Sequence, residues 1–255
     1  MELIMYSYFR IVRSGIEEIT NWPNNFISKL LNPVLYLLFL GIAMNSMINK
    51  TSNNISYIVF LFPGLLCIEA SNSFSRTIFM SSNHLKWGVI SLFVLTGSSI
   101  IDYIAAMITT ALVLFLTQAT ILGLIMLAFG FAPITSILRA VFTSALGLLF
   151  WVPAGLIIGI TIKGYMKRDL ITTIVVLPLM LSSTAFYDLH NAPVVLRFIS
   201  YLNPITCHVD LVRSSFSSNQ ALNRNALIIF IILIIFTFIS ALLLLKRTDL
   251  VSGER

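Results

Sequence analysis

Long runs of apolar residues separated by short polar connections dominate the chain. Each of six runs comes near the roughly 20 residues that a helix needs to cross the hydrocarbon core of a bilayer. An isolated strand would leave its backbone polar groups unsatisfied in lipid, whereas a helix satisfies them internally. The pattern therefore predicts an all-α integral membrane protein, a single transmembrane domain over 1–255, with transmembrane helices at 26–48, 57–75, 100–129, 137–162, 170–186 and 226–245.

The first 22 residues carry a different pattern. Arg10 and Glu17 fall on one side of a helical projection, and Val12 and Ile16 fall on another. Such a stripe with modest total hydrophobicity is typical of a helix lying in the membrane interface. The charges also argue against the apolar core of a cleavable signal peptide. We expect an amphipathic interfacial helix at 1–22, either a simple anchor or a lever between a cytoplasmic partner and the first span.

The connection after the second span is long enough for a helix of its own. Ser81-Ser82-Asn83 has the composition of a helix cap, and Leu85, Val89 and Leu92 follow at helical spacing. The segment is too short and interrupted to span a bilayer. We expect a helix at 82–92 that lies across the inner surface and ends near Thr96-Gly97-Ser98.

The connection between the fifth and sixth spans is longer than most loops that join membrane helices. The fifth span breaks at Pro178, the chain turns at Asn191-Ala192-Pro193, and two amphipathic pieces follow that are joined at Asn203-Pro204. Proline and asparagine in these positions end or begin helices. We expect re-entrant or surface helices at 187–216 that cover the outer end.

Composition and charge support this class and orient it. The chain is 58% hydrophobic and 10% charged, with a formal net charge of +6, whereas soluble domains carry about 25% charged residues. Lys and Arg concentrate on the side that holds both termini, so that side should be cytoplasmic. No basic run stands clear of the spans, which argues against a nucleic-acid partner. The richer side holds Arg10, Arg13, Arg76, Lys86, Lys163, Lys167, Arg168, Lys246, Arg247 and Arg255, and the other Lys50, Arg139, Arg197, Arg213 and Arg224.

Motifs of catalysis and nucleotide binding are missing from the sequence. It contains no G-x-x-x-x-G-K-[ST], G-x-S-x-G, H-E-x-x-H or C-x-x-C. His84, His190 and His208 fall on different connections, so no metal site is expected, and Cys67 and Cys207 fall at different levels, so no disulfide is expected. The chain is predicted to be no enzyme, without catalytic residues, metal or cofactor, and any energy must come from a partner.

One polar patch interrupts the second span. Glu69 is the ionisable residue nearest the middle of a span, and Asn72 follows it at helical spacing. A charge at that depth costs about 2.5–3.5 kcal/mol on insertion scales, so it must face protein or water, or be neutral. Two interpretations stay open: the lining of a cavity, or a hydrogen bond between helices.

Taken in order, several short motifs resemble a known family. They are Pro63-Gly64-Leu65-Leu66, the turn from Phe186-Tyr187 to Pro193, and Leu202-Asn203-Pro204-Ile205-Thr206 followed by Asp210 and Arg213. The chain resembles the type 2 membrane subunit of ATP-binding-cassette (ABC) exporters, in the compact bacterial form that exports drugs, nodulation factors and polysaccharides. It departs from the family after the second span, where RTIFMSSNHLK keeps Arg76 but lacks the acidic residues of an Arg/Glu-rich run.

The resemblance implies a complex in the bacterial plasma membrane. Two copies of the membrane subunit would pair above two nucleotide-binding ATPase subunits, which would bind the ATP and Mg. The helix at 82–92 resembles a coupling helix that docks on the ATPase, and the loop at 163–169 resembles a second contact. Implied ATPase contacts are Asn83, His84, Lys86, Trp87, Lys163, Tyr165, Lys167, Arg168, Glu17 and Glu18; implied path or gate residues are Glu69, Asn72, Phe186, Tyr187, Asn203 and Pro204.

The expected function is therefore outward movement of a hydrophobic or amphipathic substrate, such as a drug or natural product, driven by a separate ATPase. Export of a lipid-linked glycan, polysaccharide or lipid is the alternative within the same machinery. A secondary transporter would show paired broken helices in two related halves with midplane charge. A membrane-embedded enzyme would gather His, Asp or Glu at one depth, and neither pattern is seen.

Overall fold

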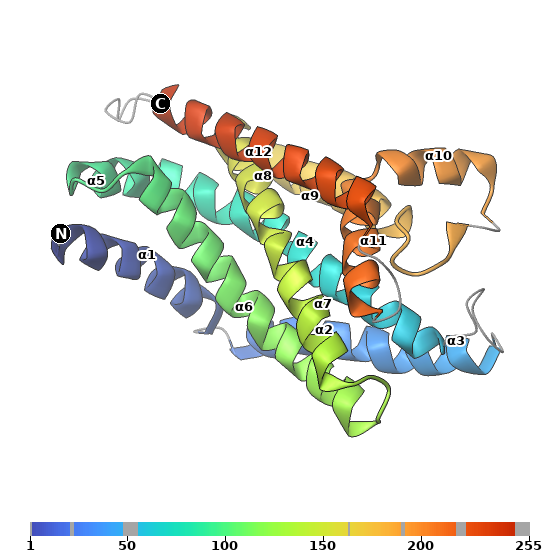
Figure 1. The fold of residues 1–255 in the computed structure, drawn as a ribbon. Helices are drawn as coiled ribbons and strands as arrows, with labels where there is room; N and C mark the ends of the chain where they lie inside the picture. The colour runs from blue at the N-terminus through green and yellow to red at the C-terminus, as the bar shows by residue number, and fades with distance from the viewer. Residues whose placement is uncertain are drawn as a thin grey trace.

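The computed structural model describes residues 2–20, 23–47, 56–162, 164–189, 192–217 and 223–247. Within these ranges the chain folds into helices without strands (Figure 1). They are α1 (Glu2–Thr20), α2 (Pro23–Leu35), the π-helical segment η1 (Tyr36–Leu40), α3 (Gly41–Met47), α4 (Tyr57–Lys86), α5 (Val89–Leu95), α6 (Ile100–Ala128), α7 (Ile134–Leu146), α8 (Leu148–Thr161), α9 (Tyr165–Leu181), α10 (Val194–Leu202), α11 (Pro204–Phe216) and α12 (Arg224–Arg247).

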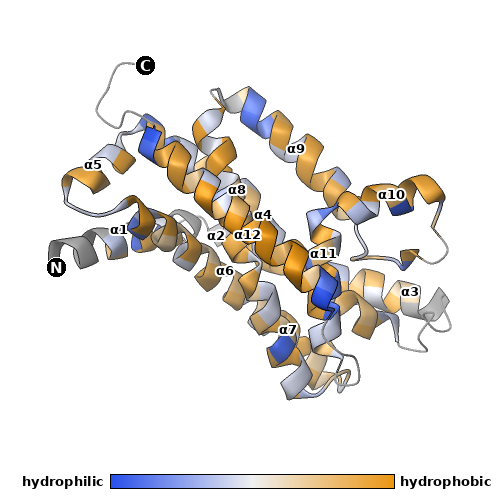
Figure 2. Ribbon diagram, turned by 45° about the horizontal axis from the view of Figure 1, so that its top comes forward, coloured by the Kyte–Doolittle hydropathy of each residue, from blue (hydrophilic) through white to orange (hydrophobic). Residues whose placement is uncertain are grey.

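Among the described residues, four helical stretches are long and apolar enough to cross a membrane. They are Tyr57–Lys86, Ile100–Ala128, Ile134–Thr161 and Arg224–Arg247. Large apolar side chains such as Phe142 and Phe236 are 69% and 67% exposed, as expected for helices whose outer surface meets lipid. Figure 2 shows hydrophobic residues, in orange, along much of the length of the helices. The chain is therefore an all-α integral membrane protein, and six spans remain a prediction.

The regions predicted as the first and fifth spans are helical, but their elements differ from the predicted ones. The first runs without a gap through α2, η1 and α3, so a π segment lies inside the span predicted at 26–48, and Pro33 lies inside α2. Five-residue π segments widen a helix locally and interrupt its regular bonding. Helix α9 has 17 residues and ends at Leu181, three residues beyond Pro178 and short of the predicted end at residue 186.

The helix predicted at 82–92 does not exist as a separate element. Helix α4 continues for 30 residues to Lys86, and the break falls at Trp87-Gly88. Ser81 and Ser82 cap nothing, because their hydroxyls donate back to the carbonyls of Thr77 and Phe79 within α4. Hydroxyl side chains often bond in this way inside a helix when the helix is held by tertiary packing.

Helix α6 begins where the sequence predicts, and Asp102 in its first turn has a structural role. Ser99 caps the helix by accepting from the backbone N–H of Asp102 at 3.2 Å, and the Asp102 carboxylate accepts from the Ser99 N–H at 2.9 Å. This reciprocal capping box satisfies two backbone donors at the helix start.

Close packing of α4 against α8 forms the centre of the molecule. Gly155 and Gly159 of α8 lie four residues apart and face α4, where a Cβ on Gly155 would come within 2.6 Å of the Phe74 carbonyl oxygen. Small residues at this spacing let two membrane helices approach closely. Thr77, Ile78 and Ser81 of α4 lie at this contact and are at most 3% exposed.

The bundle has two ends that differ in their elements. One end, called the α5 end here, holds α5, the start of α1, the end of α12 and the connection from α8 to α9 (Figure 1). The opposite end, the α10 end, holds α10 and the end of α3. The predicted pair of short helices joined at Asn203-Pro204 is present there as α10 and α11.

Candidate functional site

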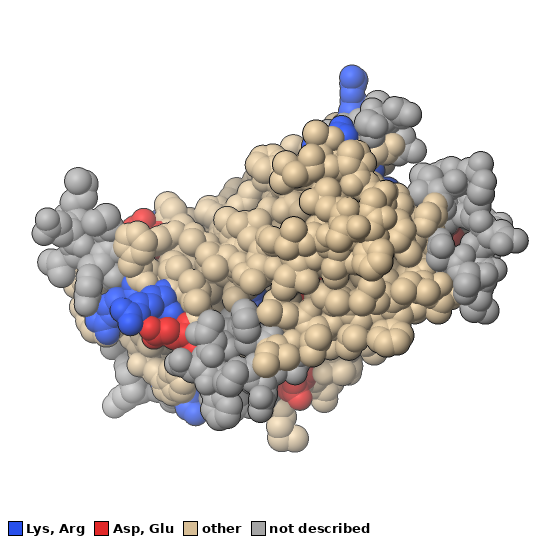
Figure 3. Space-filling view, turned by 90° about the horizontal axis from the view of Figure 1, so that it is seen from below, with Lys and Arg blue, Asp and Glu red and all other residues tan. Residues whose placement is uncertain are grey.

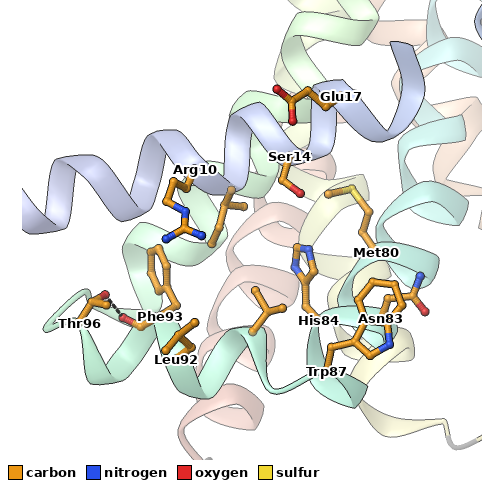
Figure 4. Close-up of a pocket in the computed structure, with 12 residues that line it drawn as sticks. Arg10, Ser14, Glu17, Met80, Asn83, His84, Trp87, Leu92, Phe93 and Thr96 are labelled. Atoms are coloured by element: carbon orange, nitrogen blue, oxygen red, sulfur yellow. Dashed lines mark hydrogen bonds between the residues drawn. The ribbon is translucent and has the colours of Figure 1, made fainter. Parts of the chain in front are cut away.

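A pocket of about 500 Å³ lies at the α5 end, between α1, the end of α4 and α5 (Figure 4). It brings together four residues that the resemblance implied as ATPase contacts: Glu17 from α1, and Asn83, His84 and Trp87 from the α4–α5 turn. The full lining is Arg10, Ile11, Ser14, Glu17, Met80, Asn83, His84, Trp87, Val89, Leu92, Phe93 and Thr96.

The pocket exists because the chain reverses sharply after α4. Gly88 adopts a left-handed backbone with φ of 68°, which glycine adopts without the steric cost that a Cβ brings. Helix α5 then folds back and buries Ile90 and Phe93, which are 1% and 4% exposed. Trp87 stays at the rim and is 69% exposed.

Asn83 and His84 are positioned differently from their neighbours. They are 6% and 7% exposed, and the Nδ1 atom of His84 lies 3.0 Å from the hydroxyl of Tyr103 on α6. The Tyr103 ring also packs edge-on against His84 and Phe93. These two residues form the inner wall of the pocket, while Lys86 and Trp87 are exposed beside it.

Helix α1 forms the opposite wall. Ile11 and Val12 are buried and Arg13 is exposed, so the predicted amphipathic division of the helix is present. The hydroxyl of Tyr8 lies 2.6 Å from that of Thr109 on α6, which fixes the helix against the bundle. Arg13 and Glu17 form an exposed ion pair at 2.6 Å, a kind of pair that contributes only about 0–1 kcal/mol. The side chain of Glu18 lies outside the described residues.

A second groove of about 470 Å³ separates α4 from the start of α9. Its lining includes Arg168, whose Nε donates to the carbonyl of Ile162 at 2.7 Å and so closes the α8–α9 turn. Lys167 is exposed next to it. Lys163 and the side chain of Tyr165 lie outside the described residues. The turn lies at the same end as the α5 pocket (Figure 1) but does not line it.

The charged side chains are also distributed unevenly between the two ends of the molecule. Figure 3 shows Lys and Arg gathered at the end that holds α1, with acidic side chains beside them, and a broad uncharged face in the middle. An uncharged belt next to a basic end is typical of a membrane subunit with its positive end at the cytoplasm.

At the α10 end, Asn203 joins α11 to the end of α9. Its side-chain oxygen accepts from the Ile205 N–H at 2.8 Å and so caps α11, which begins with Pro204. Its Nδ2 atom donates to the Leu179 carbonyl at 2.6 Å and to the Ser182 hydroxyl at 3.1 Å. A single side chain thus starts one helix and holds the end of another.

Arg213 of α11 makes the second connection. Its Nη2 donates to the Thr184 carbonyl at 3.0 Å and lies 3.5 Å from the Phe60 carbonyl of α4, and its guanidinium lies 4.0 Å from the centre of the Phe60 ring. The Thr184 hydroxyl donates to Asp210 at 3.4 Å. Burial raises the pKa of Asp210, and Arg213 opposes that shift.

Tyr57 and Gly64 complete the contact between α4 and the segment after α9. The Tyr57 hydroxyl donates to the Phe186 carbonyl at 2.8 Å, and Gly64 lies so close to the Ala185 backbone that a Cβ would collide with it. Tyr187 donates to the Leu181 carbonyl at 2.7 Å. We call Tyr57, Phe60, Thr184, Asn203, Asp210 and Arg213 the polar latch.

Glu69 and Asn72 do not belong to either end. Glu69 is 6% exposed and accepts from the Asn72 side chain at 3.3 Å, with further interactions from Arg76 and from Gln118 of α6. Of the two interpretations left open by the sequence, this placement favours the contact between helices.

His208 is buried, although its sequence context gives no sign of this. The ring of His208 on α11 stacks on Phe230 of α12 at 4.9 Å, receives a hydrogen bond from Trp151 at 3.4 Å, and fills the space that a side chain at Gly147 would need. Burial lowers the pKa of His208 to about 4. Among the described residues, no group of three or more His, Cys, Asp or Glu side chains is placed to hold a metal.

Together, the long apolar helices and the basic end define a multi-pass membrane protein. The family model for ABC-2 type transporters matches residues 8–217, so the chain belongs to that family. It is 22% identical to nodulation protein J of Rhizobium leguminosarum bv. viciae over 253 residues, covering 91% of this chain and 95% of that protein. It is also 26% identical to the putative transport permease ycf38 of Porphyra purpurea over 206 residues, covering 78% of this chain and 69% of that one. The chain is thus a membrane permease of an ABC transporter, in a family that normally works with an ATP-binding subunit.

Proposed function

We propose that this permease exports a hydrophobic or amphipathic molecule, such as a drug or natural product, across a bacterial plasma membrane. Two copies would pair and bind two ATPase subunits, which would hold the ATP and Mg. The α5 end would face the cytoplasm together with both chain termini. The basic charge at that end supports this orientation (Figure 3).

The observation that carries the proposal is the meeting of α1 with the α4–α5 turn at a basic, hollowed surface. Exposed Trp87 and Lys86 offer contacts to a soluble subunit, and Lys167 offers a second contact at the neighbouring turn. Asn83 and His84 are buried, so in this arrangement they support the surface from within. Glu69 and Asn72 lie within one subunit, whereas Asn203 and Pro204 belong to the α10 end.

Export of a lipid-linked glycan, polysaccharide or lipid is the alternative cargo. Residues of the α4–α9 groove include apolar Ile78, Phe79 and Met166 beside Arg168 and Asp169, a mixture that suits an amphiphile. Transport assays that compare a drug, a lipid and a lipid-linked glycan at equal concentration would distinguish these cargoes.

The test replaces Trp87 with Ala and measures ATP hydrolysis by the reconstituted complex. Removing a large exposed aromatic from an interface typically costs about 2 kcal/mol or more, so coupled hydrolysis should fall at least about tenfold. Tyr201→Ala is the matched control, because Tyr201 is an 80% exposed aromatic at the α10 end. Unchanged coupling in the Trp87 variant, with normal membrane insertion, would remove this residue from the docking role.

Without its ATPase subunit, the permease should not transport any substrate against a concentration gradient. Vesicles that contain the purified chain alone should show no concentrative uptake of any cargo, even with an imposed proton gradient. Active accumulation under those conditions would instead support a secondary transporter.

A further inference from the structure

His208 is the residue at which the middle of α11 meets α8 and α12. Its ring stacks on Phe230 of α12 at 4.9 Å, and its Nδ1 atom accepts a hydrogen bond from Nε1 of Trp151 on α8 at 3.4 Å. Gly147, between α7 and α8, leaves room for the ring, because a Cβ at this position would collide with it. The ring is 0% exposed. One ionisable side chain therefore fastens α11 to the bundle.

The bond from Trp151 determines where the imidazole carries its hydrogen. An indole N–H can only donate, so Nδ1 of His208 accepts and the neutral ring carries its hydrogen on Nε2. A second proton would go to Nδ1, and the new N–H would point at the N–H of Trp151. Two donors would then face each other, with a positive charge buried between an indole and a phenyl ring. The packed arrangement of α11 thus suits only the neutral form of His208.

Among the described residues, no charged side chain acts on the ring of His208. Burial lowers the pKa of His208 to about 4, and the backbone of Ser144, which opposes this shift, is the other influence. The ionisable groups around α11 interact with Arg213 instead, and they are Asp210 of α11, Tyr57 and Cys67 of α4, and Asp188 after α9. Helix α8 carries no ionisable residue, and those of α9 lie in its first turns, at the α5 end. Arg139 of α7, Arg197 of α10 and Arg224 of α12 are exposed.

Helix α11 also carries two members of the polar latch on either side of His208. Asn203 caps its start and donates to the Leu179 carbonyl of α9, and Arg213 near its end donates to the Thr184 carbonyl. His208 lies midway between them. Because α11 is a short, continuous helix of 13 residues, a displacement at His208 moves both connections together.

We propose that His208 is an acid-sensitive switch of the polar latch: a proton taken up at Nδ1 opposes the N–H of Trp151, α11 separates from α8, and Asn203 and Arg213 leave their partners. The open arrangement exposes the ring to water and binds the proton better, so acid shifts the population toward it. The closed arrangement is fully favoured above the ordinary pKa of about 6.5 and is lost as the pH falls toward 4. The inference rests on the proposed function only in placing the α10 end outside the cell, where an acidic medium would act on it.

The test is labelling of Cys67, which is 0% exposed and interacts with Ser144 and Arg213. The reagent is a dipyridyl disulfide, which reacts with thiols at acidic as well as neutral pH. The full-length chain with Cys207→Ala is purified in a mild detergent without ATPase, and its rate at each pH is divided by the rate of the same chain unfolded in SDS. With a pKa of about 4 in the closed arrangement and about 6.5 in the open one, the normalised rate should rise about 30-fold from about pH 7.5 to about pH 5.

His208→Gln should remove the rise, because the amide stays neutral while it still offers a donor and an acceptor. Trp151→Phe, which removes the opposing N–H and keeps an aromatic ring, should reduce the rise several-fold. His84→Gln is the matched control, because it makes the same substitution at a second buried histidine, at the α5 end, and it should keep the full rise. Asp210→Asn removes the carboxyl group of the latch and should keep the rise as well.

Four results would overturn the proposal. They are a constant normalised rate in the parent chain, a full rise in His208→Gln or in Trp151→Phe, an equal loss of the rise in His84→Gln, and a loss of the rise in Asp210→Asn. Far-UV circular dichroism of the parent should be the same at both pH values, and a loss of helix at the lower pH would assign the labelling to general unfolding. Because neither ATPase nor cargo is present, these outcomes are independent of the docking test on Trp87.

Discussion

Replacing Arg213 with Ala should release the polar latch. The side chain joins three elements, because it belongs to α11, donates to Thr184 after α9, and lies over the Phe60 ring of α4. Alanine removes all of these contacts at once. It also leaves Asp210, whose carboxylate faces the same cluster, without its neighbouring positive charge.

The expected size of the effect follows from those contacts. The bond to the Thr184 carbonyl at 3.0 Å has a charged donor, while the 3.5 Å approach to the Phe60 carbonyl is too long to add much. Hydrogen bonds to charged groups contribute about 1.5–3 kcal/mol, and a partly buried cation–π contact contributes about 0.5–1 kcal/mol or more. A loss of about 2–3 kcal/mol would raise the population of the open latch about 30- to 150-fold.

Cys67 gives a direct assay of that opening. It is 0% exposed and interacts with Ser144 of α7 and, electrostatically, with Arg213 and Asp210 of α11, so a membrane-permeant maleimide should reach it only when the latch opens. In a Cys207→Ala background, the Arg213→Ala chain should label at Cys67 about 30- to 150-fold faster than the parent. Arg197→Ala is the control, because Arg197 donates to the Ala192 carbonyl just before α10 and does not belong to the polar latch. A labelling rate within twofold of the parent would refute the reasoning that Arg213 holds the latch closed.

Two further predictions concern packing and pH. Gly155→Ala should destabilise the chain by about 1–3 kcal/mol in thermal unfolding, because its Cβ would lie 2.6 Å from the Phe74 carbonyl, whereas Gly123→Ala meets only the Ile137 side chain and should cost less. His208 has a folded-state pKa of about 4 against 6.5 when unfolded, so its contribution is complete above about pH 6.5 and is lost as the pH falls toward 4, by up to about 3 kcal/mol. A His208→Gln chain should lack that part of the acid destabilisation, and an identical pH profile for both chains would contradict the assignment.

The membrane class and several helix positions could be predicted because lipid imposes a strict physical constraint. Long apolar runs have only one way to satisfy their backbone there, so α6 and α12 lie within two or three residues of their predicted ends. The predicted pair α10 and α11 rested on Asn203-Pro204, whose capping chemistry is local. Features set by local chemistry or by the solvent are readable from a single sequence.

Features set by tertiary contact were not predicted. Ser81-Ser82-Asn83 has the composition of a cap, but packing against Gly155 and Gly159 of α8 keeps α4 helical through these residues. The spacing of those two glycines was a readable signal for that contact. The residues of the π segment at Tyr36–Leu40 carry no comparable pattern that would have predicted it.

The candidate site residues also include features that the sequence predicts and features that it does not. Glu17, Asn83, His84 and Trp87, which the resemblance implied as ATPase contacts, line one pocket, but sequence alone did not reveal that Asn83 and His84 are buried. Asn203 also has two partners more than 20 residues away, at Leu179 and Ser182. Such pairings depend on how helices pack, so they become visible only in three dimensions.

Helix α4 links the two ends of the molecule physically. Tyr57 and Phe60 at its start belong to the polar latch, and His84 and Trp87 at its end belong to the pocket. A 30-residue helix is about 45 Å long, and close packing along α8 resists bending because the glycine contacts leave no space to move into. A force applied at Trp87 should therefore shift α4 as a rigid rod and strain the contacts of Arg213 and Tyr57. An ATPase that binds Trp87 more tightly in one nucleotide state could then bias the latch by that difference in affinity alone.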